Sequence, residues 1–134
     1  MQFLKTLSAV SVTFALTALG TISSADESGK VEYMDSCASC HGESGLGDGP
    51  LAELMTVSVP GLTDLSAKND GVFPMLKVIQ TVDGRQGIRG HGYPMPVWGG
   101  RFKASVEEMG PYGAEVVVRG RILSLAYYLQ SIQQ

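Results

Sequence analysis

Cys37-Ala38-Ser39-Cys40-His41 is the stretch of this 134-residue chain from which its organisation follows. Two cysteines three positions apart, with a histidine directly after the second, form the attachment signature of a c-type haem. The two thiols can add to the two vinyl groups on one edge of a porphyrin, and the histidine can then bind the iron from the proximal side. The pattern therefore predicts one covalently attached haem, held by Cys37 and Cys40, with His41 as an axial ligand.

Three other interpretations of the cysteine pair compete with this one: a thioredoxin-like redox pair, half of a zinc site, and a short disulfide. A redox pair of this kind normally adjoins a βαβ pattern, and the sequence shows none. A zinc site would need further ligands, and His91 is the only other histidine. Cys37 and Cys40 are the only cysteines, so neither has a further cysteine as a partner, but an oxidising compartment could still join the two in a short disulfide. We therefore favour haem attachment.

The first 25 residues have the pattern of a secretory signal peptide. Lys5 supplies a positive charge, Leu7–Leu19 form an apolar run, and Ser23-Ser24-Ala25 offers the small residues that a signal peptidase recognises. The apolar run is shorter than the roughly 20 residues that cross a membrane. We expect a cleaved signal at residues 1–25 and a mature domain at residues 26–134, with an uncleaved membrane anchor as the alternative. Export predicts a periplasmic protein, and the periplasm is where bacteria attach c-type haems.

The expected mature domain is small, acidic and rich in glycine. The full chain has 10 basic and 13 acidic residues, and loss of Lys5 with the signal would leave a net charge of −4. This charge argues against nucleic acid and anionic membrane surfaces as partners, and favours redox partner proteins with a basic docking patch. The length suits one domain, in which a buried porphyrin would supply much of the apolar interior.

The spacing of apolar residues predicts an all-α domain. Gly29 to Cys40 is predicted as a helix that runs into the haem signature, and Tyr112 to Ser131 as the longest helix, with an apolar face near a period of 3.6. Gly29 either precedes the first helix or lies inside it, close to another backbone or ring. Turn-forming residues divide the chain between these helices, which leaves only short helices at residues 51–57, 63–69 and 74–82.

Residues 85–100 form an irregular segment that presents one methionine. Met95 stands between Pro94 and Pro96, and the two prolines remove two amide donors and fix two φ angles. A stiff backbone lowers the entropic cost of holding the thioether sulfur at one point, which suits a bond to iron. We therefore predict Met95 as the distal axial ligand, with His91 as the alternative.

With these pieces placed, the chain resembles the class I cytochrome c family, the mono-haem fold with histidine and methionine ligands. The residues that carry the resemblance are Cys37, Cys40 and His41 in the attachment motif, Met95-Pro96 in the late loop, Gly29 and Tyr33 in the first helix, and Leu125-Ala126-Tyr127-Tyr128-Leu129 in the last. The resemblance implies a small all-α fold. Its N- and C-terminal helices would cross closely at Gly29, and short helices and long loops would wrap around one haem.

Further residues have expected roles around the haem. By the same resemblance, Pro50 is the candidate whose carbonyl accepts the hydrogen bond from His41 Nδ1. Trp98 would pack on the macrocycle or donate its indole N–H to a propionate, or it would be an ordinary core aromatic. Three arginines flank the segment with Met95 and are candidate propionate partners: Arg85, Arg89 and Arg101.

The function expected from these ligands is electron transfer and not catalysis. With His41 and Met95 both bound to the iron, no position is left for a substrate, and the metal would cycle between Fe(II) and Fe(III). Two alternatives stay open. A haem subunit of a larger oxidoreductase would use the same residues, whereas a haem enzyme or gas sensor would require a labile sixth ligand.

Overall fold

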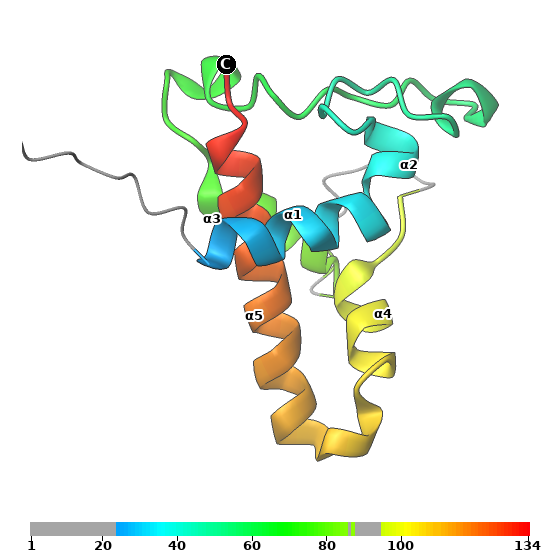
Figure 1. The fold of residues 1–134 in the computed structure, drawn as a ribbon, viewed down its shortest axis with the longest axis vertical. Coiled ribbons are helices and arrows are strands. Elements are labelled where there is room, and N and C mark those ends of the chain that lie inside the picture. Colours follow the sequence, from blue (N-terminus) through cyan, green and yellow to red (C-terminus); the bar gives the residue numbers. More distant parts are fainter. Residues whose placement is uncertain (1–23, 86, 88–94) are drawn as a thin grey trace, which may run out of the picture.

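The computed structural model describes residues 24–85, 87 and 95–134, and within these ranges the chain forms helices and no strand. The elements in chain order are α1 (Ser24–Ser36), α2 (Ala38–His41), η1 (Ala52–Leu54), η2 (Ala67–Asn69), α3 (Met75–Asp83), α4 (Trp98–Ala104), η3 (Glu107–Met109) and α5 (Gly110–Ser131). Figure 1 shows α5 as the long axis of the molecule, with α1 crossing it towards one end. The predicted all-α fold is confirmed. The expected signal peptide lies almost wholly outside the described residues, and its cleavage stays a prediction.

α1 and α5 cross at Gly29. A Cβ atom on Gly29 would overlap the backbone carbonyl oxygen of Ser124 and lie 2.8 Å from Tyr128 Cβ. Glycine is required here because the two backbones touch. Gly29 therefore lies inside α1 and allows α5 to pack against it. One turn later, the fully buried Tyr33 packs its ring 5.2 Å from that of Tyr128 and donates its hydroxyl to the carbonyl of Gly42 at 2.5 Å. The predicted crossing of the terminal helices is present.

The single helix predicted over Gly29–Cys40 is divided in two. α1 ends at Ser36, and the chain turns at Cys37 before α2 begins. Helical hydrogen bonds continue on both sides of the turn, from the Cys37 amide to the carbonyl of Tyr33 (2.8 Å) and from the His41 amide to the carbonyl of Cys37 (2.9 Å). The break is therefore local, and it directs α2 away from the axis of α1 (Figure 1).

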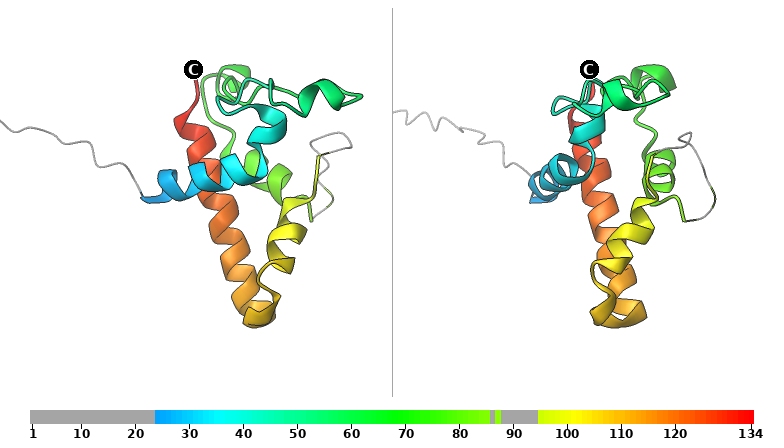
Figure 2. Two further views of the ribbon diagram at one scale, coloured as in Figure 1. Left: turned by 45° about the vertical axis from the view of Figure 1, so that its right-hand side comes forward. Right: turned by 90° about the vertical axis from the view of Figure 1, so that its right-hand side faces the viewer.

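The helix α4 begins inside residues 85–100, for which the sequence predicts irregular structure, and continues beyond them to Ala104. Two glycines in its first turn, Gly99 and Gly100, make it a poor helix by propensity alone. The Phe102 side chain of α4 is buried, and the guanidinium of Arg121 from α5 lies 4.0 Å from the centre of its ring. Packing against α5 therefore stabilises this helix. Figure 2 shows from two further directions that α4 runs beside the half of α5 that α1 does not cover.

The other predicted helices are present with shifted ends. α3 begins one residue after Pro74 and ends at Asp83, where Gly84 takes the left-handed conformation with φ 65°. η1 and η2 are single short turns within longer predicted ranges, and α5 begins two residues earlier than predicted. No helix within the described ranges is long and apolar enough to cross a bilayer.

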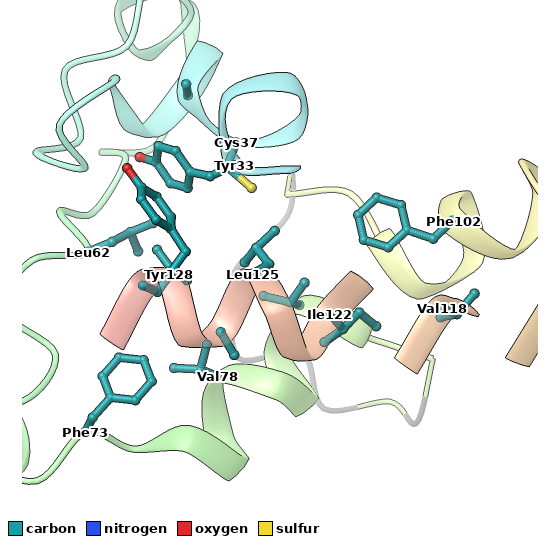
Figure 3. Packing of buried hydrophobic residues seen from close by; sticks show 14 residues of the cluster. Tyr33, Cys37, Leu62, Phe73, Val78, Phe102, Val118, Ile122, Leu125 and Tyr128 are labelled. Carbon is teal, nitrogen blue, oxygen red and sulfur yellow. The ribbon is translucent and has the colours of Figure 1, made fainter. Parts of the chain in front are cut away.

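The core gathers around one side of α5. Figure 3 shows Leu125 and Ile122 of α5 with side chains from α1, α3, α4 and the loop before η2 around them. The buried members of this cluster are Tyr33, Cys37, Ala38, Leu62, Phe73, Val78, Val82, Phe102, Val118, Ile122, Leu125, Ala126, Tyr128 and Leu129. Because Cys37 belongs to this core, the predicted attachment motif lies at its edge and not on a free surface.

Candidate functional site

Two adjoining cavities lie between α2, the loop that follows η1, α3 and the segment that leads into α4. Their volumes are about 320 Å³ and about 560 Å³. Of the residues that the structure describes, four line both cavities: Cys37, His41, Pro60 and Met95. Cys40 lines the larger one. The structure thus brings to one place the two cysteines, the histidine and the methionine that the sequence predicts around a haem.

The walls of these cavities are largely apolar. The smaller cavity is walled by α3 and α5 and by the loop before η2, through Leu62, Leu65, Val78, Val82, Leu125 and Leu129. The larger cavity adds Met55, Val57, Val59 and Trp98. A porphyrin ring needs such an apolar lining, with a few polar groups that fix its orientation. The residues present therefore fit a haem, although the sequence pattern does not predict which residues of α3 form the wall.

His41 is buried and is oriented by the backbone. Its Nδ1 lies 3.0 Å from the carbonyl oxygen of Pro60, and because a carbonyl can only accept, Nδ1 carries the proton. In that tautomer Nε2 holds the lone pair that binds a metal. Burial lowers the pKa of His41 below its ordinary value, and the hydrogen bond to Pro60 opposes this shift. The imidazole is therefore neutral at neutral pH, as a metal ligand must be.

The acceptor of the His41 hydrogen bond is Pro60, so the prediction of Pro50 in this role is wrong. Pro50 is exposed on the glycine-rich loop that follows α2. That loop folds back on itself, since a Cβ atom on Gly47 would lie 2.5 Å from the carbonyl oxygen of Val59. The return of the chain, and not the first proline after the motif, brings a carbonyl to His41. The only sequence signal for it is the turn-forming pair Pro60-Gly61.

The two cysteines differ in their surroundings. Cys37 is buried, and burial, followed by the nearby charges of Glu32 and Cys40, raises the pKa of the Cys37 thiol to about 12. Cys40 is half-buried, and one turn of backbone joins the pair, from the Cys40 amide to the carbonyl of Cys37 at 3.1 Å. Within the described part of the chain, no group of three or more His, Cys, Asp and Glu side chains could hold a metal ion by itself. The zinc interpretation of the cysteine pair therefore finds no ligand set there.

Met95 and Trp98 lie where the chain enters α4. Met95 is half-buried against both cavities, and Trp98, the first residue of α4, lines the larger one. The Trp98 ring also contacts the core, with its centroid 5.6 Å from that of Phe102. Two of the expected roles of Trp98, packing on the macrocycle and core aromatic, are thus compatible with its position, and its indole N–H as a propionate donor stays a prediction. The alternative ligand His91 lies outside the described residues.

The arginines that were candidate propionate partners differ in position. Arg101 lines the larger cavity and lies 5.4 Å from the centre of the Trp98 ring, so it fits the expected role. Arg85 is bound by two carboxylates, those of Asp83 and Glu115, and this contradicts the expected role. Arg89 lies outside the described residues.

Comparison with known proteins adds one finding. A family model described as Cytochrome c matches residues 27–110, a range that contains both cysteines, His41 and Met95. The match ends at the first residue of α5, so the assignment of α5 as the second crossing helix rests on its contact with Gly29. No match to a curated protein or to a solved structure was found.

Proposed function

The chain belongs to the cytochrome c family, and from that premise we propose that it is a periplasmic mono-haem electron carrier with His41 and Met95 as axial ligands. Haem-based electron transfer is the general role of the family. The observation that carries the more specific proposal is that Cys37, His41 and Met95 line the same two cavities. The signal-like pattern of residues 1–25 supports the periplasmic location.

Each residue of the site has a defined task in this proposal. Cys37 and Cys40 would hold the ring covalently on one edge. His41 would bind from one face, with its orientation set by Pro60. The bound haem supplies the one-electron couple. The protein contributes two ligands, an apolar wall and the exclusion of water.

The ligand pair and the walls act in the same direction on the redox equilibrium. A thioether sulfur stabilises ferrous iron more than an imidazole does, and an apolar environment disfavours the extra charge of the ferric state. The walls from α3 and α5 would therefore raise the reduction potential together with Met95. Retention of the same two ligands in both states would keep rearrangement on electron transfer small.

Two surface properties support transient docking near the larger cavity. The expected mature domain carries a net charge of −4 without Lys5, which favours a partner with a basic patch. Leu51 and Val57 line that cavity and are exposed, so the contact itself would be apolar. Charge would then guide the approach of the partner, and apolar side chains would hold the brief contact.

The test of the proposal is the visible spectrum of the reduced holoprotein before and after addition of carbon monoxide. Because both axial positions are filled in the proposal, we expect a sharp low-spin spectrum that carbon monoxide does not change. Met95→Ala should bind carbon monoxide rapidly, whereas His91→Ala should behave as the wild type. Rapid binding by the wild type would instead support a haem enzyme or gas sensor, and an open site only in His91→Ala would assign the ligand to His91.

A further inference from the structure

Three charged side chains form a cluster where α3 ends, and we call it the Arg85 clamp: Asp83, Arg85 and Glu115. The Arg85 guanidinium donates to Asp83 twice, from Nε to Oδ1 at 2.5 Å and from Nη2 to Oδ2 at 2.9 Å. It also donates to Glu115 of α5 twice, from Nη1 to Oε2 at 2.7 Å and from Nη2 to Oε1 at 3.1 Å. The guanidinium therefore joins the end of α3 to α5 through two forked ion pairs, the geometry in which such pairs are strongest.

The clamp lies where the chain that leaves α3 at residues 84–85 meets the chain that enters α4 at residues 97–99, on either side of Met95. A Cβ atom on Gly99, in the first turn of α4, would lie 2.6 Å from Arg85 Nε and 2.8 Å from the carbonyl oxygen of Asp83. A Cβ atom on Gly84 would lie 3.2 Å from a methyl group of Val97. The chain therefore leaves α3 and returns to α4 at one point, and Arg85 holds that point against α5.

The surroundings of the clamp favour strong ion pairs. Its side chains are only 24% (Arg85), 19% (Asp83) and 30% (Glu115) exposed, so solvent screens these pairs less than ordinary surface pairs. The hydrogen bonds from Arg85 hold the pKa values of Asp83 and Glu115 below their usual range. Both carboxylates are therefore charged at neutral pH, and the clamp is closed there.

We propose that Arg85 is a positioning residue for Met95: it fixes the base of the Met95 segment to α5 and so determines how firmly the thioether sulfur stays on the iron. The inference rests on the proposed function, in which Met95 is an axial ligand. Arg85 is not among the described residues that line either cavity, so it acts through the backbone that it fixes. α5 also supplies Leu125 and Leu129 to the cavity wall, so the clamp sets the segment relative to that wall.

The test is a titration of the ferric holoprotein with imidazole, which competes with Met95 for the iron. Loss of the clamp would weaken the Met95-bound state and leave the imidazole-bound state almost unchanged. We expect Glu115→Gln to bind imidazole about tenfold more tightly than the wild type. The weak long-wavelength absorption band of ferric iron bonded to thioether sulfur should fade in the same titration.

Arg119→Ala is the matched control. Arg119 donates from Nε to the same Glu115 carboxylate at 2.9 Å, but it is 76% exposed and lies one turn further along α5. We expect it to leave the imidazole affinity unchanged. Arg85→Lys keeps the positive charge and loses the fork, so it should bind imidazole more tightly, as Glu115→Gln does.

Thermal unfolding of the same variants separates positioning from a purely structural role. A structural role alone would lower the unfolding temperature and leave the imidazole affinity of the folded protein unchanged. Equal affinity in the wild type, Glu115→Gln and Arg85→Lys, with the thioether band present in all three, would overturn the clamp and leave the proposed function standing. A wild-type ferric spectrum without that band would overturn the proposed function, and the clamp with it.

Discussion

Gly29 of α1 lies against the backbone carbonyl of Ser124 in α5, so closely that no Cβ atom fits between them. This contact fixes the register of the two helices. It places Tyr33 one turn later against Tyr128, and Cys37 two turns later at the edge of the core. The attachment motif is thus positioned by a glycine eight residues before it.

Substitution of Gly29 by alanine tests this crossing. Alanine is the better helix former, so the change would stabilise an uncrowded helix by about 1 kcal/mol. At Gly29 the overlap with α5 should outweigh that gain, and we expect a loss of about 1–3 kcal/mol in the free energy of unfolding. Chemical denaturation of the holoprotein measures it.

Gly120→Ala is the control for the crossing. Gly120 lies inside α5, and a Cβ atom there would meet no heavy atom within 4 Å. We expect Gly120→Ala to stabilise the protein by up to about 1 kcal/mol. An increase in the free energy of unfolding in both variants would show that the crossing does not require glycine.

The return of the loop to His41 can be tested at Gly47. Gly47 has φ 81°, and a Cβ atom there would crowd the carbonyl of Val59, next to the Pro60 acceptor. We expect Gly47→Ala to lower the free energy of unfolding by roughly 1–2 kcal/mol, because alanine is strained in the left-handed conformation, and by about a further 1–3 kcal/mol from crowding. It should also shift the reduction potential, because the hydrogen bond that orients His41 is disturbed.

Gly71→Ala isolates the cost of the backbone conformation. Gly71 has φ 80°, and a Cβ atom there would meet nothing within 4 Å. We expect Gly71→Ala to lower the free energy of unfolding only by the roughly 1–2 kcal/mol of a left-handed alanine, and to keep the wild-type reduction potential. A shift in potential as large as that of Gly47→Ala would contradict a specific role for the loop return at Pro60.

The Arg85 clamp gives a pH dependence of stability. Hydrogen bonds from Arg85 and Arg119 lower the pKa of Glu115 from its ordinary 4.5 to about 2. A carboxyl group whose pKa is lower in the folded state stabilises the protein fully above 4.5, and this stabilisation is lost as the pH falls towards 2. We therefore expect the wild type to exceed Glu115→Gln in unfolding free energy at neutral pH, and the difference to shrink over this window. Denaturation at a series of pH values measures it, and a constant difference would contradict the prediction.

The residues that line the two cavities around the attachment motif could be predicted from the sequence because their signals lie close together in the chain. Cys37, Cys40 and His41 lie within five residues, and the prolines beside Met95 are its neighbours in the chain. The segment around Gly29 does not by itself predict a helix crossing there, and only the family resemblance indicates it.

What could not be predicted depends on the path of the chain in space. Pro60 reaches His41 only because the glycine-rich loop returns, and α4 is helical because Phe102 packs against α5. Arg85 is only a candidate propionate partner by sequence, since nothing local indicates that Glu115, 30 residues away, binds it. In each case the decisive neighbour is distant in sequence, and no local pattern shows that the two residues meet.

The position of α5 has a consequence for how the protein acquires its cofactor. α5 forms part of the wall of the smaller cavity and contacts Gly29 and Arg85. Both residues lie well before α5 in the chain. Contacts between such distant segments form late, because the chain must first close a long loop. We therefore expect the attachment motif to be accessible to the haem-loading machinery until the docking of α5 encloses the ring.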